Sequence, residues 1–234
     1  LEIVPGTDAI TWWSEDMREE FQKRKGYDIM PYLFLMTDLP QVNAVYNAYI
    51  PRAVGRFDLE GDADLREKTI NDFLDVLTQL YRERLLVPLK EWLNSVGIET
   101  RAQISYGRSF EISEPIMDVD YPEAENYNQY DQVDILRLWT GGAKLQNKVL
   151  STETTALNFA ANATQQMRIQ DAYAQYAAGF QRIIWHIWSA DYGLGNYEWP
   201  GFATGASFAH MAKRYPASET YDELNAHLGR IQQL

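Results

Sequence analysis

The stretch Asn147-Lys148-Val149-Leu150-Ser151-Thr152-Glu153-Thr154 decides the fold that we expect for this chain. Val149 and Leu150 predict a short buried strand, which ends in small polar residues and a carboxylate. A helix is predicted next, from about Thr164 to Ala178, and after a glycine Arg182-Ile183-Ile184-Trp185-His186 predicts a second strand with a titratable end. This alternation is typical of a parallel (β/α)₈ barrel, in which chemistry gathers at the C-terminal strand ends.

The remaining sequence alternates in the same way. Apolar residues recur at helical spacing from Asp62 to Ser95, where Pro88 predicts a kink and Gly97 a stop. We expect a loop over residues 38–61 and an acidic loop over residues 121–126. The other predicted elements are strands at residues 1–4, Ile98–Ile104 and Met117–Asp120, and helices at Glu15–Lys25 (capped by Ser14 and ended by Gly26), Gln129–Thr140 (ended by Gly141-Gly142) and Thr220–Gln233.

We therefore expect an α/β fold, in which residues 1–234 form a partial (β/α)₈ catalytic domain. The chain begins inside an apolar and acidic segment, Leu1-Glu2-Ile3-Val4, and does not begin with Met. From this we expect that upstream strands are absent. Further domains of the same full-length chain are then its expected partners.

Composition excludes several classes of function. The net charge of −12 argues against nucleic acid and against an anionic membrane surface, because both need clustered Lys and Arg. With no cysteine, disulfides, thiolate catalysis and Cys-ligated metals are excluded. No apolar run is long enough to span a bilayer. Lack of cysteine is compatible with an exported protein, so we expect a periplasmic or extracellular location.

Titratable and polar side chains follow the predicted strand ends, which converge on one pocket in a barrel. Carboxylates at successive ends point to glycosidic bonds, where one acid protonates the leaving oxygen and a second carboxylate activates water or attacks the sugar. Neighbouring negative charges keep such an acid protonated near neutral pH. We predict Glu2 and Glu153 as the catalytic pair, in either order of roles. The predicted substrate-binding residues are Gln103, His186, Trp188 and Trp199.

Each of these residues also has an ordinary structural interpretation. A single Glu near a strand end is more often solvated or ion-paired, and repetition at successive ends is what favours catalysis. Glu123 and Glu125 could form a polar loop, bind sugar hydroxyls or bind Ca²⁺, which takes carboxylate oxygens. His186 could be a buried histidine, and Trp199 could pack its own loop rather than contact a sugar.

Five segments of the chain resemble glycoside hydrolase family 106, the α-L-rhamnosidases. The most specific segment matches the pattern F-x-x-R-x-G-Y-D-x-x-P-Y-L, which runs here from Phe21 to Leu33 after Leu1-Glu2 and Trp12-Trp13-Ser14. The others are Gly97–Gln103 with Tyr106-Gly107, Asp120–Glu125, Ser151–Glu153, and Gly179–His186 with Trp199-Pro200-Gly201. They occur in the family's order over nearly the whole chain. Residues 38–61 and 192–199 follow no family pattern that we can place.

This resemblance implies a segment from strand four to helix eight of the barrel, acting on terminal α-L-rhamnose or a similar sugar. It implies Glu2 as the general acid, Glu153 as the base, Glu123 or Glu125 as a ligand of Ca²⁺, and His186 as a residue lining the sugar site. It also implies inversion, for which the carboxylates stand about 6.5–9.5 Å apart. The alternatives are a retaining glycosidase of the β-galactosidase type, with a separation nearer about 5 Å, and a non-catalytic carbohydrate-binding barrel.

Overall fold

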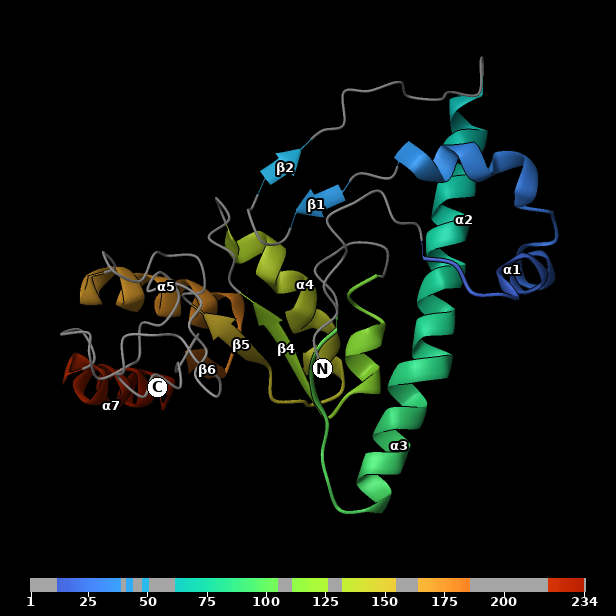
Figure 1. Cartoon of the computed structure of the whole chain (residues 1–234). Helices are drawn as coiled ribbons and strands as arrows, with labels where there is room; N and C mark the ends of the chain where they lie inside the picture. Colours follow the sequence, from blue (N-terminus) through green and yellow to red (C-terminus); the bar gives the residue numbers. More distant parts are fainter. Residues whose placement is uncertain are drawn as a thin grey trace, which may run out of the picture. The chain divides into compact units, whose positions relative to one another are not determined.

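The computed structural model describes eight stretches of the chain, which divide into two units, Leu1–Asp120 and Tyr121–Leu234. The described residues are 12–38, 41–43, 48–50, 62–104, 111–125, 132–154, 164–185 and 219–233. Together they form a mixed α/β chain with a parallel sheet (Figure 1). Within these ranges, no helix is long and apolar enough to cross a membrane.

The first unit begins with helix α1 (Met17–Lys25), which buries Met17 and Phe21. It ends as predicted at Gly26, whose φ of 82° and N–H bond to the Gln22 carbonyl make a left-handed C-cap. The predicted Ser14 cap is wrong, because Asp16 stands at the N-cap and makes no side-chain capping bond. A 3₁₀ helix, η1 (Met30–Asp38), follows.

The longest element of the first unit is one helical rod in three parts, α2 (Ala63–Tyr81), the π-helical turn η2 (Arg82–Leu86) and α3 (Val87–Ser95) (Figure 1). The Asp62 carboxylate caps it by accepting the Leu65 N–H at 2.9 Å. This confirms the predicted helix from Asp62 to Ser95. Pro88 has no N–H to donate to the preceding turn, and the chain widens into the π turn just before it.

Three further predictions for the first unit need correction. Residues Met117–Asp120 were predicted as a strand, but Pro115–Asp118 forms the 3₁₀ helix η3. Strand β3 spans only Arg101–Gln103, which is shorter than predicted. Within the predicted loop at residues 38–61, β1 (Gln41–Asn43) and β2 (Ala48–Ile50) form an antiparallel pair. Short strands of this kind are specified by pairing partners rather than by local periodicity.

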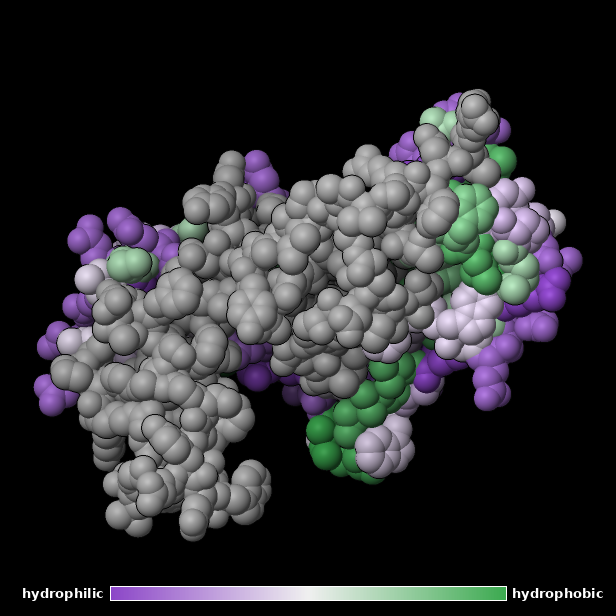
Figure 2. All heavy atoms as spheres, turned by 45° about the horizontal axis from the view of Figure 1, so that its top comes forward, coloured by the Kyte–Doolittle hydropathy of each residue, from purple (hydrophilic) through white to green (hydrophobic). Residues whose placement is uncertain are grey.

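Apolar residues of the first unit remain exposed near the end of the helical rod. Leu85 lies in η2, and Val96 and Ile98 follow α3; all three are exposed. Figure 2 shows hydrophobic residues, in green, at the surface among hydrophilic ones on the side that carries this rod. The rod is held to β3 by the Tyr81 hydroxyl, which donates to the Ile104 carbonyl at 2.9 Å.

The second unit alternates strand and helix in the way that the sequence predicts. Its elements are β4 (Tyr121–Glu125), α4 (Gln132–Leu145), β5 (Ser151–Thr154), α5 (Gln165–Ala178), β6 (Arg182–Trp185) and α7 (Tyr221–Gln232). Strands β4, β5 and β6 lie in that order and pair in parallel. Helix α5 carries the predicted caps, because the Thr164 hydroxyl accepts the Met167 N–H and Gly179 ends the helix in the left-handed region.

Helix α4 runs through the two glycines at which we predicted its end. It continues to Leu145, and the chain turns at Asn147, whose φ is 51°. A glycine costs a helix only about 1 kcal/mol relative to alanine. Burial of Trp139 and Ala143 on either side of the glycine pair outweighs that cost.

One core cluster joins α5, α7 and β6. It is made by Ala172, Tyr221, Leu224 and Leu228, with Ile169, Tyr176, Ile183 and Trp185 packed against it. The Trp185 indole N–H also donates to the Asn225 side chain at 2.8 Å. The two helices therefore cover the sheet face that carries Ile183 and Trp185.

Gly179→Ala is expected to destabilise the second unit by about 1–3 kcal/mol. Gly179 has a φ of 103°, and a Cβ there would lie 2.6 Å from Thr140 Cγ2. Urea denaturation measures the effect. Gly229→Ala on α7 is the control, because a Cβ there meets nothing within 4 Å and alanine favours the helix. Equal stability of the two variants would contradict the predicted clash.

Candidate active site

Two strands of the second unit bring glutamates together at their C-terminal ends. In the parallel register, Glu125 of β4 is the partner of Glu153 of β5, and Glu123 is the partner of Ser151. Neighbouring strands lie about 4.8 Å apart, and side chains two residues apart share a sheet face. Glu123, Glu125 and Glu153 therefore lie on one face, with Glu125 and Glu153 side by side.

The opposite face of these strands is the one that the helices cover. Thr154, next to Glu153, points to that face and accepts a hydrogen bond from the Gln175 amide of α5 at 2.5 Å. Ile183 and Trp185 of β6 pack there as well. In a barrel the helices lie outside and the residues on the other strand face point inward. The glutamates thus lie on the face that would be interior.

Glu123 is the buried member of the group, with 4% of its surface exposed. Its carboxylate accepts a hydrogen bond from the Ser151 hydroxyl at 2.7 Å. This corrects the predicted acidic loop at residues 121–126, since Glu123 and Glu125 lie on a strand. The position of β5 also differs from the prediction. The sequence predicts a strand at Val149-Leu150, whereas β5 spans Ser151–Thr154, whose backbone pairs with β4 and β6.

The predicted calcium ligands, Glu123 and Glu125, do not make a calcium site from the described residues alone. Ca²⁺ takes six to eight oxygen ligands. Among the residues that the structure describes, no group of three or more acidic or histidine side chains is placed to hold a metal. Ser151 already donates to Glu123. The calcium site stays a prediction that needs further ligands.

The other predicted site residues fall into two groups. Glu2, His186, Trp188 and Trp199 lie outside the described residues, so the pairing of Glu2 with Glu153 stays a prediction. Gln103 is buried on β3, which belongs to the first unit, whereas the three glutamates belong to the second. Of the two residues predicted to be catalytic, Glu153 lies in the described part of the chain, near the end of β5.

Sequence reasoning gave no role to three residues on the glutamate face, Ser151, Arg182 and Tyr121. The Ser151 hydroxyl donates to Glu123, and Arg182 of β6 is the register partner of Ser151. The Arg182 guanidinium lies 5.6 Å from the centre of the Tyr121 ring. This puts a cation in the same row as Glu123 and Ser151. The period-two patterns Glu-Ala-Glu and Ser-Thr-Glu carry this signal, once both segments are recognised as strands.

Ser151→Ala is expected to lower the free energy of unfolding by about 1 kcal/mol. The substitution removes a hydroxyl donor from the buried Glu123 carboxylate. Urea denaturation at neutral pH measures it, with Ser113→Ala, at an exposed serine, as the control. A Ser151 variant as stable as the Ser113 variant would show that the hydrogen bond does not hold Glu123.

Comparison of the chain with protein-family models, with curated proteins and with solved structures finds no match. A function for this chain is therefore inferred from its residues and from the register of β4, β5 and β6.

Proposed function

We propose that this chain is part of the (β/α)₈ catalytic barrel of a glycoside hydrolase. The reaction is removal of terminal α-L-rhamnose, or a similar sugar, from a polysaccharide or glycoside. The observation that supports it most is the register that sets Glu125 beside Glu153 at the ends of two parallel strands. Paired carboxylates at strand ends are the groups that glycosidic hydrolysis needs.

The arrangement of the helices supports a barrel over a doubly wound sheet. The Thr140 hydroxyl of α4 donates to the Ala178 carbonyl of α5 at 2.5 Å, and α5 in turn packs with α7. Helices that follow successive strands are thus neighbours on one side. A doubly wound sheet places helices on both faces, whereas a barrel places them all outside.

In the proposed mechanism, the Glu153 carboxylate takes a proton from water, and that water attacks the anomeric carbon. Glu2 protonates the leaving oxygen. Positioned general acids and bases contribute about 10²- to 10⁴-fold each. Ser151 and Glu123 lie on the same sheet face, two residues before Glu153 and Glu125 along their strands. Their hydrogen bond holds the Glu123 carboxylate in place next to the proposed site. Gln103, His186, Trp188 and Trp199 are the proposed sugar contacts.

A second candidate reaction is retaining hydrolysis with Glu125 in the place of Glu2. The observation that favours it is that Glu125 and Glu153 are register partners on adjacent strands, and adjacent strands lie about 4.8 Å apart. Two carboxylates this close leave little room for a water between them, and retaining enzymes hold theirs about 5–5.5 Å apart. In this mechanism Glu153 attacks the sugar directly, and Glu125 serves as the acid and then as the base.

The full-length protein, assayed with 4-nitrophenyl α-L-rhamnoside and followed by proton NMR, tests both reactions. Inversion is expected, so the first sugar formed should be the β anomer. Release of the α anomer first would establish retention. Release from a β-galactoside alone would favour the β-galactosidase type, and no release from either glycoside would leave a non-catalytic carbohydrate-binding barrel. We further propose that the protein acts in the periplasm or outside the cell.

A further inference from the structure

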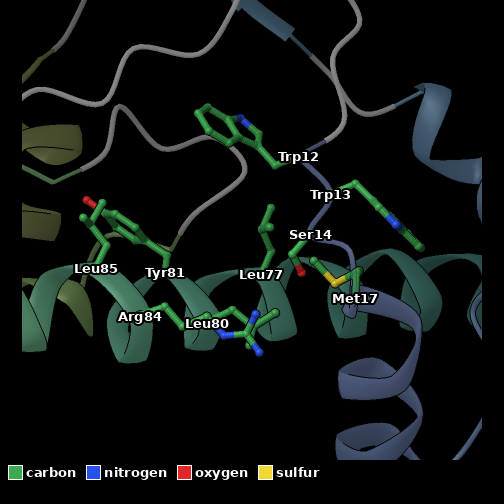
Figure 3. Close-up of a pocket in the computed structure, with 9 residues that line it drawn as sticks. All are labelled: Trp12, Trp13, Ser14, Met17, Leu77, Leu80, Tyr81, Arg84 and Leu85. Carbon is green, nitrogen blue, oxygen red and sulfur yellow. The ribbon is translucent and has the colours of Figure 1, made fainter.

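A cavity of about 230 Å³ lies within the first unit, between residues 12–17 and the helical rod. Figure 3 shows side chains around it from the segment before α1, from the first residue of α1, and from α2 and η2. The lining residues are Trp12, Trp13, Ser14, Met17, Leu77, Leu80, Tyr81, Arg84 and Leu85. Aliphatic and aromatic side chains make up most of this lining.

Two indole rings stand at the cavity with large exposed areas, 40% for Trp12 and 42% for Trp13. Trp13 is held in place by stacking on Phe73, with ring centres 6.3 Å apart and an interplanar angle of 17°. On the other side, the Tyr81 ring is fixed through its hydroxyl bond to the Ile104 carbonyl. The Trp13 and Tyr81 rings are therefore already held in place, and a pre-ordered surface lowers the entropy lost on binding.

The charged residue of the lining, Arg84, is neutralised by a partner. Its two terminal nitrogens donate to the two Asp16 oxygens at 2.8 and 2.6 Å. The hydrogen bond from Arg84 lowers the pKa of Asp16, so the pair stays ionised at neutral pH. The cavity therefore presents no net charge from this pair, which favours an uncharged ligand.

Part of the cavity lining comes from the π turn η2. Arg84 and Leu85 belong to η2, and Tyr81 immediately precedes it. A π turn inserts an extra residue into the helical repeat and changes the direction of the side chains around it, and such turns are frequent at functional sites. The irregularity in the rod thus coincides with the cavity.

We propose that this cavity binds one uncharged six-membered ring with an apolar face. An apolar cavity of about 150 Å³ holds benzene, and drug-sized ligands need about 300 Å³ or more, so this cavity fits a single ring. Two sources supply such a ring, a deoxyhexose such as L-rhamnose, stacked by its C–H face on an indole, or the aryl group of a glycoside. The choice of these two rests on the proposed function.

Fluorine NMR of the full-length protein labelled with 5-fluorotryptophan tests the site locally. The chain has seven Trp residues, whose signals are assigned by single Trp→Phe variants. L-rhamnose and phenol are titrated separately. The signals of Trp12 and Trp13 are expected to shift to saturation with at least one of them, while the signal of Trp92, which is 63% exposed on α3, stays unchanged.

Leu85→Phe fills the cavity and should weaken this binding at least tenfold. The matched control is Leu145→Phe on α4, at an exposed leucine outside the cavity, which should bind as the wild type does. Saturation by L-rhamnose alone identifies a sugar, and saturation by phenol alone identifies an aryl group. No shift with either ring, or equal binding by the Leu85 variant and the wild type, overturns the proposal.

Turnover of the aryl rhamnoside, measured on the same samples, separates this site from the proposed activity. Ring binding at Trp12 and Trp13 without turnover would reject the proposed function and leave the cavity as a binding site. Turnover without any shift of these two signals would reject the cavity site and leave the proposed function.

Discussion

Glu153→Gln is expected to lower the rate of aryl α-L-rhamnoside hydrolysis by about 10²- to 10⁴-fold. Glutamine keeps the size of the side chain but cannot take a proton from water. Glu153 lies at the end of β5 on the glutamate face, and the strand is fixed on both sides by pairing with β4 and β6. We therefore expect kcat to fall with no loss of folded protein, and initial rates with circular dichroism measure both.

The matched control for this variant is Glu223→Gln. Glu223 is an exposed glutamate in the first turn of α7, away from the glutamate face of the sheet. The control should hydrolyse the substrate at the wild-type rate. Wild-type turnover by the Glu153 variant would remove this residue from the mechanism, whatever the fold.

Asp120→Ala should lower the free energy of unfolding by about 3 kcal/mol at neutral pH, the largest stability effect that we expect. One Asp120 oxygen accepts hydrogen bonds from the Thr100 N–H, the Thr100 hydroxyl and the Asn94 amide, at 2.8, 2.8 and 2.9 Å. Lys90 lies 3.1 Å from the other oxygen. The carboxylate thus ties the end of α3 to the residue before β3, and its removal leaves several donors without their acceptor.

The pH dependence of this effect follows from the pKa of Asp120. Partial burial alone would raise this pKa, but the bonds from Thr100, Asn94 and Lys90 outweigh it and lower the pKa below its usual range. The stabilisation is therefore complete above the unfolded-state pKa of about 3.9 and is lost as pH falls through the lower folded-state value. The gap between wild type and variant should shrink below about pH 4.

Urea denaturation from pH 7 down to pH 2 measures this gap. Asp134→Ala is the control, because Asp134 is highly exposed and pairs only with Arg137 on the same helix among the described ion pairs. We expect almost no effect from it at any pH. A difference in unfolding free energy between wild type and Asp120→Ala that stays constant down to pH 2 would show that the charge of Asp120 does not hold α3 to Thr100.

Helices with strong local signals could be predicted from the sequence. The rod from Asp62 to Ser95 has an apolar stripe, an Asp cap and a terminal Gly97, and it forms as expected. Helix α5 has its Thr164 cap and its Gly179 stop. In these segments the periodicity, the caps and the tertiary packing all favour the same structure, which makes local reasoning reliable.

The strands of the candidate site could not be predicted in the same way. Tyr121–Glu125 contains a proline and two glutamates, and its pairing in the sheet, with β5 among others, makes it a strand. Burial of Glu123 depends on Ser151, which is distant in sequence. Glu153 was identified because it follows an apolar pair. The sequence indicated Glu125 as a Ca²⁺ ligand rather than a catalytic residue, and its place beside Glu153 follows from the strand register. Such contacts arise from the sheet and leave little trace in local propensity.

The central claim, that Glu153 is the carboxylate that acts at the anomeric carbon of a bound sugar, is tested most directly by azide rescue of Glu153→Ala. With 4-nitrophenyl α-L-rhamnoside, azide can attack the anomeric carbon from the side that Glu153 would serve, and nitrophenolate leaves without an acid. We predict that azide restores nitrophenolate release and yields β-L-rhamnosyl azide, identified by NMR. Full activity of the variant without azide, or no rhamnosyl azide with it, would contradict the account.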